Sequence, residues 1–485
     1  MDIAHRSTTA LAAALRGREI GCRELLDHYL GRIERMNPGL NAVVTLDVER
    51  ARRRADEADA ALARGETWGP LHGVPMTIKD TYETAGMRTT CGWSEIATHV
   101  PERDAEAVAR LRAAGAVIFG KTNVPTLASD VQTFNPIFGT TNNPWNVGRT
   151  PGGSSGGAAA ALAAGLTGFE LGSDIGGSIR TPAGWCGVYG HKPTWGIVPG
   201  RGHIPGPPGR LAEDDLGVFG PLARGVDDLD LGLDVLVGPG PEDARAWRIE
   251  LPPPRRDDSK AYRFAAWLDD PAFPVDGEVR TLLETAVAAL RRAGARVDDR
   301  ARPRFDFADA VRTYHYLLNP IILAGMPDDG FENLVQLAAS FPPDDDGPLA
   351  RSARAATIRH RDWLRLHERR KRIQAAFADF FRQFDVLLMP IVPVAAIPHD
   401  HSDPFPARTI MVNDAAMPYM NLFTWIGPAT MAHLPATSAP IGRTPGGLPV
   451  GIQIVGPYLE DRTPIDVARR LGAVVGGFTP PPGFA

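Results

Sequence analysis

The sequence of 485 residues predicts an α/β fold in which helices cover a central β-sheet. Short apolar runs such as "GVPMTIKD" and "LPVGIQIVGP" have the length and composition of buried strands. They alternate with longer segments in which apolar residues recur at helical spacing. Alternation of the two kinds of element along one chain is typical of layered α/β folds.

The first part of the chain is expected to be helical. Residues 7–65 contain "STTALAAALRGREI" and "CRELLDHYLGRIERM", both with apolar residues at helical spacing. The apolar run over residues 73–80 follows Gly-Val-Pro and predicts a buried strand that ends at Lys79. Residues 103–114 are then expected to form a helix, and "AVIFG" and "GFELGSD" to form further strands.

The second half begins with a change of composition. The segment "GPGPEDARAWRIELPPPRRDDSK" is rich in proline and charge and predicts a linker or a surface excursion. Helices are expected over 277–295 and 351–383, and strands over 384–393 and 448–457 before a closing helix from Thr463. We therefore expect one domain over 1–485, with a helical segment over about 1–70, a core over about 73–200, a variable segment over about 240–410 and a return to the core over about 411–485.

Composition excludes several classes of function. The formal net charge of -5 does not favour a nucleic-acid partner or an anionic membrane surface. The three cysteines, Cys22, Cys91 and Cys186, are far apart and form no CxxC motif, which fits a reducing compartment. The first residues lack the apolar segment of a signal peptide, and no run of about 18 apolar residues predicts a membrane span. We expect a cytoplasmic protein and make no prediction of its oligomeric state.

Two short motifs suggest chemistry that their surroundings do not favour. Gly115–Thr122 matches the pattern GxxxxGK[ST], but Ala-Val-Ile-Phe between its glycines is a buried strand rather than a flexible phosphate loop. Lys121 is therefore interpreted as a structural lysine. Gly152–Gly156 matches GxSxG, but loop sequence precedes it where a nucleophile elbow requires a strand. His191 is likewise assigned a structural role.

A third combination joins distant pieces of the chain. Lys79 ends a buried strand, and two glycine-rich loops containing serine follow at 152–157 and 174–178. Together they offer a nucleophile, a bridging hydroxyl and a base without histidine, and serine–lysine pairs are a known variant of the serine–histidine–aspartate triad. A lysine acts as a base only when it is neutral, and burial lowers its pKa. Asp80 is expected to point to the opposite face of the strand.

Six motifs occur in a characteristic order along the chain. They are "GVPMTIKD", "GKTNVP", "NNPWN", "GGSSGG", "GSDIGGSIRTPAGWCGVYGHKPT" and "GLPVGIQIVGP". Together they resemble the amidase signature family, densely over 73–200 and again over 385–395 and 435–457. The resemblance implies a single α/β/α domain, with a mixed and mostly parallel central sheet covered by helices on both faces. It also implies hydrolysis of amides by a Ser–cis-Ser–Lys triad.

The resemblance assigns a role to each matching residue. It implies Ser178 as the nucleophile, Ser154 as the bridging residue after a cis peptide bond to Gly153, and Lys79 as the base. It implies an oxyanion hole formed by the backbone N–H groups of Ile175, Gly176, Gly177 and Ser178. It implies supporting roles for Ser155, Ser173, Asp174 and Arg180, the last two as a pair that braces the loop. It implies no cofactor and no metal.

The substrate is expected to be a small molecule with an amide, carbamate or ester bond. The pocket is expected to be formed by parts of 126–138, 185–215 and 305–345. An apolar stripe within the last of these is interpreted mainly as core packing and consists of Tyr314, Tyr316, Leu317, Leu318, Ile321, Ile322 and Met326. Any of its members that face the pocket would favour small to medium apolar substrates. Two alternatives stay open: the A subunit of a tRNA-dependent amidotransferase, and an inactive scaffold or binding protein, against which the intact triad argues.

Overall fold

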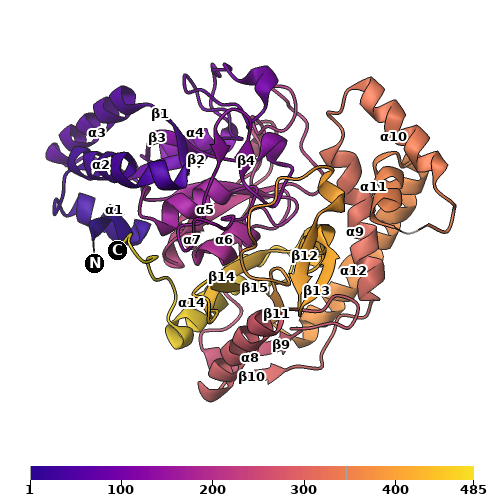
Figure 1. Ribbon diagram of the computed structural model, residues 1–485. Helices are drawn as coiled ribbons and strands as arrows, with labels where there is room; N and C mark the ends of the chain where they lie inside the picture. Colours follow the sequence, from indigo (N-terminus) through magenta and orange to yellow (C-terminus); the bar gives the residue numbers. More distant parts are fainter. Residues whose placement is uncertain (1, 346) are drawn as a thin grey trace.

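A sheet of eight strands runs through the middle of the computed structural model, which describes residues 2–345 and 347–485 (Figure 1). Its strand order is β10-β9-β11-β15-β14-β7-β8-β6. The strands are β6 (Glu170–Asp174), β7 (Tyr189–Lys192), β8 (Val218–Ala223), β9 (Arg263–Ala266), β10 (Arg296–Asp298), β11 (Val386–Pro390), β14 (Ala436–Arg443) and β15 (Pro449–Val455). The predicted layered α/β fold with a mixed central sheet is confirmed.

Strand direction changes along this sheet. The strands β10, β9 and β11 pair in parallel, and the five remaining pairs in the described sheet are antiparallel. Parallel strand pairs are thus fewer in this sheet than the resemblance implies. Connections explain the difference, because β9 and β10 are joined through a helix, whereas β14 and β15 are joined by a short turn that only antiparallel strands allow.

A second sheet has the order β1-β3-β2, formed by β1 (Val43–Leu46), β3 (Val117–Thr122) and β2 (Pro75–Lys79). It adjoins the large sheet where β2 lies beside β6. The Thr77 hydroxyl donates to Glu170 Oε1 at 2.5 Å, and Gly168 N donates to the Pro75 carbonyl at 3.1 Å. The predicted strand ending at Lys79 is confirmed, and its last residue lies next to the end of β6. Two small hairpins complete the strands: β4 (Phe134–Asn135) with β5 (Gly139–Thr140), and β12 (Thr409–Val412) with β13 (Ala415–Pro418).

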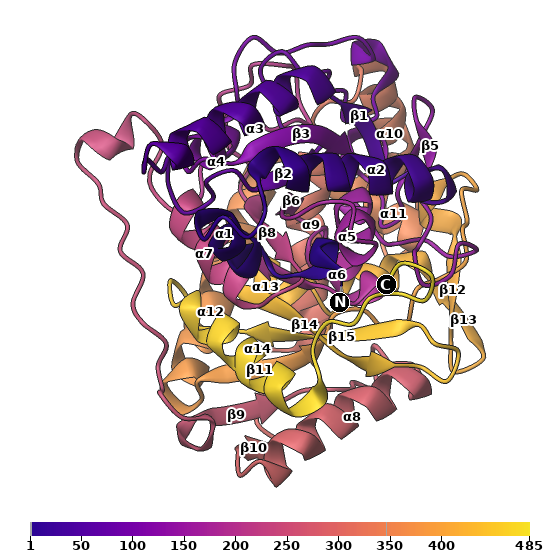
Figure 2. The same ribbon diagram turned by 90° about the vertical axis from the view of Figure 1, so that its left-hand side faces the viewer.

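Helices lie on both sides of the large sheet. In Figures 1 and 2, α6 lies above β14 and β15, whereas α8 and α14 lie below them. The helices after the N-terminal segment are α4 (Glu106–Ala113), α5 (Gly156–Ala163), α6 (Arg180–Cys186), α7 (Asp227–Leu236), α8 (Gly277–Arg292), α9 (Phe307–Ile322), α10 (Asp328–Ser340), α11 (Pro348–Ala356), α12 (His360–Gln383), α13 (Gly427–Met431) and α14 (Arg462–Val475).

Two expectations about helices need correction. The N-terminal segment contains α1 (Thr8–Arg16), α2 (Cys22–Leu40) and α3 (Val48–Ala63), but the strand β1 interrupts it. Its four residues are too few to show a period in sequence. The helix expected over 351–383 is divided into α11 and α12, because α11 ends at Ala356 and the backbone of Arg359 is extended before α12 begins.

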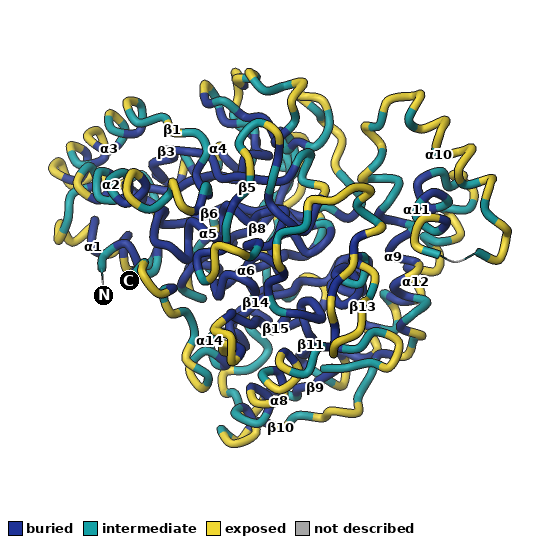
Figure 3. The backbone as a smooth tube through the Cα atoms, viewed as in Figure 1, coloured by how far each residue is buried: buried dark blue, intermediate teal, exposed yellow. Residues whose placement is uncertain are grey.

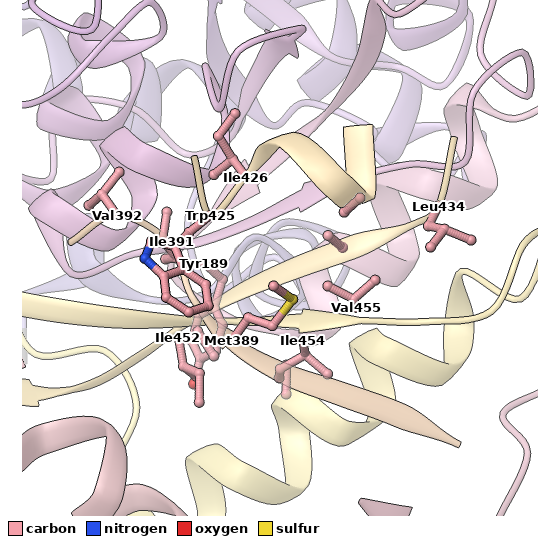
Figure 4. Packing of buried hydrophobic residues seen from close by; sticks show 14 of the residues in the cluster. Tyr189, Met389, Ile391, Val392, Trp425, Ile426, Leu434, Ile452, Ile454 and Val455 are labelled. Carbon is pink, nitrogen blue, oxygen red and sulfur yellow. The ribbon is translucent and has the colours of Figure 1, made fainter. Parts of the chain in front are cut away.

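The core follows the sheet. Figure 3 shows buried residues along the central strands and exposed residues on the outer sides of helices such as α3 and α10. Figure 4 shows Ile452 and Ile454 of β15 packed beside Met389 of β11, with Trp425 and Ile426 nearby. Within residues 2–345 and 347–485, no helix combines the length and apolar character that crossing a bilayer requires.

Candidate active site

Lys79 ends β2 in a fully buried environment. Its Nζ lies 2.7 Å from Ser154 Oγ and 2.9 Å from Ser173 Oγ, both within hydrogen-bond distance. Ser154 comes from the loop before α5, and Ser173 comes from β6. Burial lowers the pKa of Lys79 from 10.5 to about 7, because a charged ammonium loses its hydration in this environment. A substantial share of Lys79 is therefore neutral near pH 7.

Asp80 is directed away from Lys79, as expected for neighbouring residues of an extended chain. Its carboxylate accepts hydrogen bonds from Thr90 N at 3.1 Å and Thr90 Oγ1 at 2.7 Å. It also forms an ion pair with Lys121 Nζ at 3.8 Å. In the part of the chain that the structure describes, Lys79 has no ion pair, so its nearest polar partners are hydroxyl groups.

The two serine loops meet at the end of β2. The peptide bond between Gly153 and Ser154 is cis. Ser155 N donates to the Ser178 carbonyl at 3.1 Å, which joins the two loops. The Ser155 hydroxyl also lies 3.5 Å from the Ser173 carbonyl oxygen. Ser154 is 1% exposed and Ser178 is 7% exposed, so Ser178 is the serine of the two that is more accessible to a ligand.

A buried ion pair braces the loop over residues 174–178. Asp174 accepts hydrogen bonds from Arg180 Nη2 at 2.8 Å and Arg180 Nε at 3.0 Å. Burial alone would raise the pKa of Asp174, but Arg180 and neighbouring N–H donors outweigh it and lower the pKa to about 2. Arg180 also donates to the Ile426 carbonyl, Thr430 Oγ1 and Gln453 Oε1, so the loop is tied to α13 and β15.

The backbone N–H groups of this loop do not all point the same way. Gly177 N donates to Asp174 Oδ1 at 3.0 Å, so this group braces the loop instead of facing a ligand. Among residues 2–345 and 347–485, the N–H groups of Ile175, Gly176 and Ser178 have no hydrogen-bond partner. Gly177 has a φ of 86°, and a Cβ there would lie 2.8 Å from Thr181 Oγ1, so only glycine fits.

Several residues around this loop escape identification from the sequence. The Tyr314 hydroxyl donates to the Ile175 carbonyl at 2.8 Å, although its spacing places Tyr314 in an apolar stripe. Leu317 and Leu318 of the same stripe are buried core residues, as expected, whereas Tyr316, Ile321 and Met326 are partly buried and Ile322 is exposed near the end of α9. Gln453 is a polar residue inside an otherwise apolar strand, and this contrast is a signal that could have identified it.

Lys121 and His191 have structural contacts. Lys121 lies on β3, fully buried, and its Nζ donates to the Tyr82 carbonyl at 2.5 Å and to two threonine hydroxyls. It thus belongs to a strand and not to a phosphate-binding loop. His191 lies between Thr437 Oγ1 at 2.9 Å and Asp461 Oδ1 at 3.1 Å, both within hydrogen-bond distance.

Known proteins that are similar to this chain identify its family. The family model described as Amidase matches residues 24–464. The chain is 34% identical to the A subunit of glutamyl-tRNA(Gln) amidotransferase from Synechococcus sp. (strain CC9902), over 97% of this chain and 96% of that protein. Among solved structures, 6-aminohexanoate cyclic dimer hydrolase superposes with a TM-score of 0.81 at 28% identity and covers 100% of both chains.

A solved amidotransferase structure is also similar. The A subunit of glutamyl-tRNA(Gln) amidotransferase from Thermotoga maritima superposes with a TM-score of 0.77 at 26% identity, over 99% of this chain and 98% of that one. The family model and the long match at 34% identity cover nearly the whole sequence, including the strand with Lys79 and both serine loops. The chain therefore belongs to the amidase signature family of amide hydrolases.

Proposed function

We propose that the protein hydrolyses carboxamide C–N bonds through an acyl-enzyme on Ser178, with Ser154 as the bridging residue and Lys79 as the base. One observation carries this proposal: Lys79 Nζ is fully buried and lies 2.7 Å from Ser154 Oγ. The pKa of Lys79, about 7, leaves part of it neutral at neutral pH. The hydrogen bond from Ser155 N to the Ser178 carbonyl joins the loop of Ser178 to the loop of Ser154, which supports the proposal.

The proposed reaction moves one proton along the three side chains. Ser178 Oγ attacks the substrate carbonyl carbon while its proton passes to Ser154 Oγ, and the Ser154 proton passes to neutral Lys79 Nζ. The oxyanion accepts hydrogen bonds from the free N–H groups of the 175–178 loop, and each such donor contributes about 3–4 kcal/mol to transition-state stabilisation. The amine leaves with a proton returned along the same path, and water then hydrolyses the ester on Ser178.

The surroundings of the loop support an apolar substrate. A Cβ on Gly176 would lie 3.0 Å from the Phe423 ring, and one on Gly177 would lie 3.3 Å from Ile426. Tyr314 and Ile426 are fully buried and Phe423 is 9% exposed, so the side chains packed around the proposed oxyanion site are largely apolar and Phe423 is the one of the three with surface open to a substrate. Burial of apolar substrate surface contributes about 25 cal/mol per Å². We therefore propose small to medium apolar amides as substrates, with carbamates and esters as related carbonyl compounds open to the same attack.

A second candidate rests on the sequence relatives. Several curated relatives at 33–34% identity are described as the A subunit of glutamyl-tRNA(Gln) amidotransferase. A protein of this kind would release ammonia from an amide donor such as glutamine and act as one component of a larger enzyme. The relatives favour this candidate, whereas the apolar side chains beside the loop favour the first. Both use the same acyl-enzyme on Ser178.

A substrate panel separates the two candidates. The purified chain is incubated with anilides from acetyl to hexanoyl, an aryl carbamate and free glutamine, and amine or ammonia release is measured. The first candidate predicts hydrolysis by the chain alone, with kcat/KM rising as the acyl group grows. Activity limited to glutamine, or seen only with partner proteins and charged tRNA, would support the second.

A covalent probe tests the nucleophile independently of the substrate. A fluorophosphonate should label the wild-type chain and fail to label Ser178→Ala, while a matched change at the exposed Ser94, Ser94→Ala, should leave labelling unchanged. Retained labelling of folded Ser178→Ala would overturn the assignment of Ser178. Circular dichroism of both variants controls for folding.

A further inference from the structure

A cavity of about 920 Å³ lies away from the proposed active site. It is formed by one side of α12, by the residues around the starts of β9 and β11, and by the loops that follow α13 and β15. The proposed triad and the 174–178 loop contribute no residue to its lining. Two of its residues, Arg255 and Arg256, come from the charged, proline-rich segment that the sequence predicts as a linker or surface excursion.

The lining carries an excess of positive charge. Its cations are Arg255, Arg256, Arg263, Lys371 and Arg382, and its carboxylates are Asp385 and Glu460. His433 also lines the cavity and adds no charge, since burial and the nearby Arg370 lower its pKa to about 3. The lining therefore has three more positive than negative side chains, and one of these cations, Arg382, is paired with Asp379 outside the lining.

Two carboxylates hold three of the guanidinium groups in place. Asp385 is fully buried and is shared by Arg263 Nη2 at 2.8 Å and by Arg256 Nε and Nη2 at 3.2 Å each. Glu460 accepts two bonds from Arg255, at 2.5 and 2.7 Å. Arg255 also forms an ion pair with Asp385 at 3.6 Å. Two carboxylates thus hold three arginines in place without neutralising all of their charge. Guanidinium groups held in this way can donate hydrogen bonds to the oxygen atoms of a phosphate group. Their side chains are already fixed in place before a ligand binds.

Lys371 adds a cation that is not committed to another group. It lies on the exposed side of α12, and within the described ranges it has no ion-pair partner. The same cavity is also lined by apolar and aromatic side chains: Phe381, Leu434, Pro457 and the half-exposed Tyr458. A ligand that satisfies both parts has an anionic group and an apolar or aromatic body.

We propose that this cavity binds a small organic phosphate ester, with the phosphate held by Arg256, Arg263 and Lys371 and the organic part against Phe381 and Tyr458. This site is separate from the proposed hydrolysis and does not depend on it. The probes are inorganic phosphate, phenyl phosphate and citrate, titrated calorimetrically at constant ionic strength. Phenyl phosphate should bind more tightly than inorganic phosphate, because its ring adds apolar contact.

Two charge reversals test the location. Lys371→Glu should weaken phenyl phosphate binding at least fivefold. Lys260→Glu should have no effect, because Lys260 is an exposed lysine that does not line the cavity. Ser178→Ala should bind phenyl phosphate like the wild type, so failure of the proposed function and failure of this site are distinguishable. Thermal unfolding of each variant verifies that it is folded.

Three results would overturn the proposal. One is the absence of heat with all probes at millimolar concentration. Another is equal weakening by Lys371→Glu and Lys260→Glu, which would indicate a general effect of net charge. The third is tighter binding of citrate than of phenyl phosphate, which would assign the cavity to polycarboxylates.

Discussion

Two buried lysines on neighbouring parallel strands have different surroundings. Lys79 ends β2 and Lys121 lies on β3, where Ile78 pairs with Lys121 and Lys79 pairs with Thr122. Both side chains are fully buried. Lys79 contacts the hydroxyl groups of two serines, whereas Lys121 contacts a backbone carbonyl, two threonine hydroxyls and the carboxylate of Asp80.

The comparison shows that burial alone does not determine the role of a lysine. Burial lowers the pKa of Lys79 to about 7 and that of Lys121 to about 8, and Asp80 opposes the shift at Lys121. A carboxylate 3.8 Å away stabilises the ammonium form of Lys121, which then acts as a structural cation. Lys79 lacks such a neighbour, so its amine is the one suited to accept a proton.

The largest expected effect is on catalysis. Lys79→Met should reduce kcat/KM by about 10²- to 10⁴-fold, because the base is removed while the apolar part of the side chain is kept. The measurement is turnover of the best substrate from the panel. Lys121→Met is the matched control, and its folded fraction should retain kcat/KM within about tenfold. Near-normal turnover by Lys79→Met would contradict the role of Lys79 as the base.

The second effect is on stability. Lys121→Met should lower the free energy of unfolding by about 3–5 kcal/mol, because Asp80 loses its cation and the Tyr82 carbonyl loses a donor inside the protein. Urea unfolding monitored by circular dichroism measures this. Lys79→Met should have a smaller effect, since it removes no ion pair. If Lys79→Met is the less stable of the two variants, the comparison between the lysines fails.

The third effect is a pH dependence of activity. The neutral form of Lys79 accepts the proton, and its pKa is lowered to about 7, so activity is lost as pH falls through that value. We expect kcat/KM to fall about tenfold per pH unit below about 7 and to reach a plateau above it. Lys192 is buried with a similarly lowered pKa, so Lys192→Met is the control and should leave the midpoint unchanged. If Lys192→Met shifts the midpoint, the pH profile reports the titration of Lys192 and not that of Lys79.

The smallest effect concerns Ser173, the second of the two hydroxyl groups that contact Lys79. Ser173→Ala removes one hydrogen bond of 2.9 Å and leaves that to Ser154, so kcat should fall by about 2- to 10-fold, the equivalent of one hydrogen bond. Ser173→Thr keeps the hydroxyl and should restore part of the loss. A loss as large as that of Lys79→Met would show that Ser173, not Ser154, carries the proton.

Much of this architecture could be predicted from local sequence. The strand ending at Lys79 is a short apolar run with a clear end, the strand expected in "GFELGSD" ends where Gly176 and Gly177 follow, and the structure confirms both. The strand β1 could not be predicted, because four residues show no period. The division of α11 from α12 could not be predicted either, because helical spacing does not reveal that the backbone of Arg359 is extended.

Residue type and order are enough to reveal the chemical groups: a lysine at a strand end, then two glycine-rich loops with serine, in a pattern shared with the amidase signature family. How these groups meet depends on the tertiary fold. Lys79 and Ser173 are 94 residues apart in the chain, and Arg180 and Gln453 are 273 apart, yet each pair is in hydrogen-bond contact. Folding also removes both Lys79 and Lys121 from water and places a carboxylate beside only one. Proton affinity depends on that local solvation and charge, which residue type and spacing do not contain.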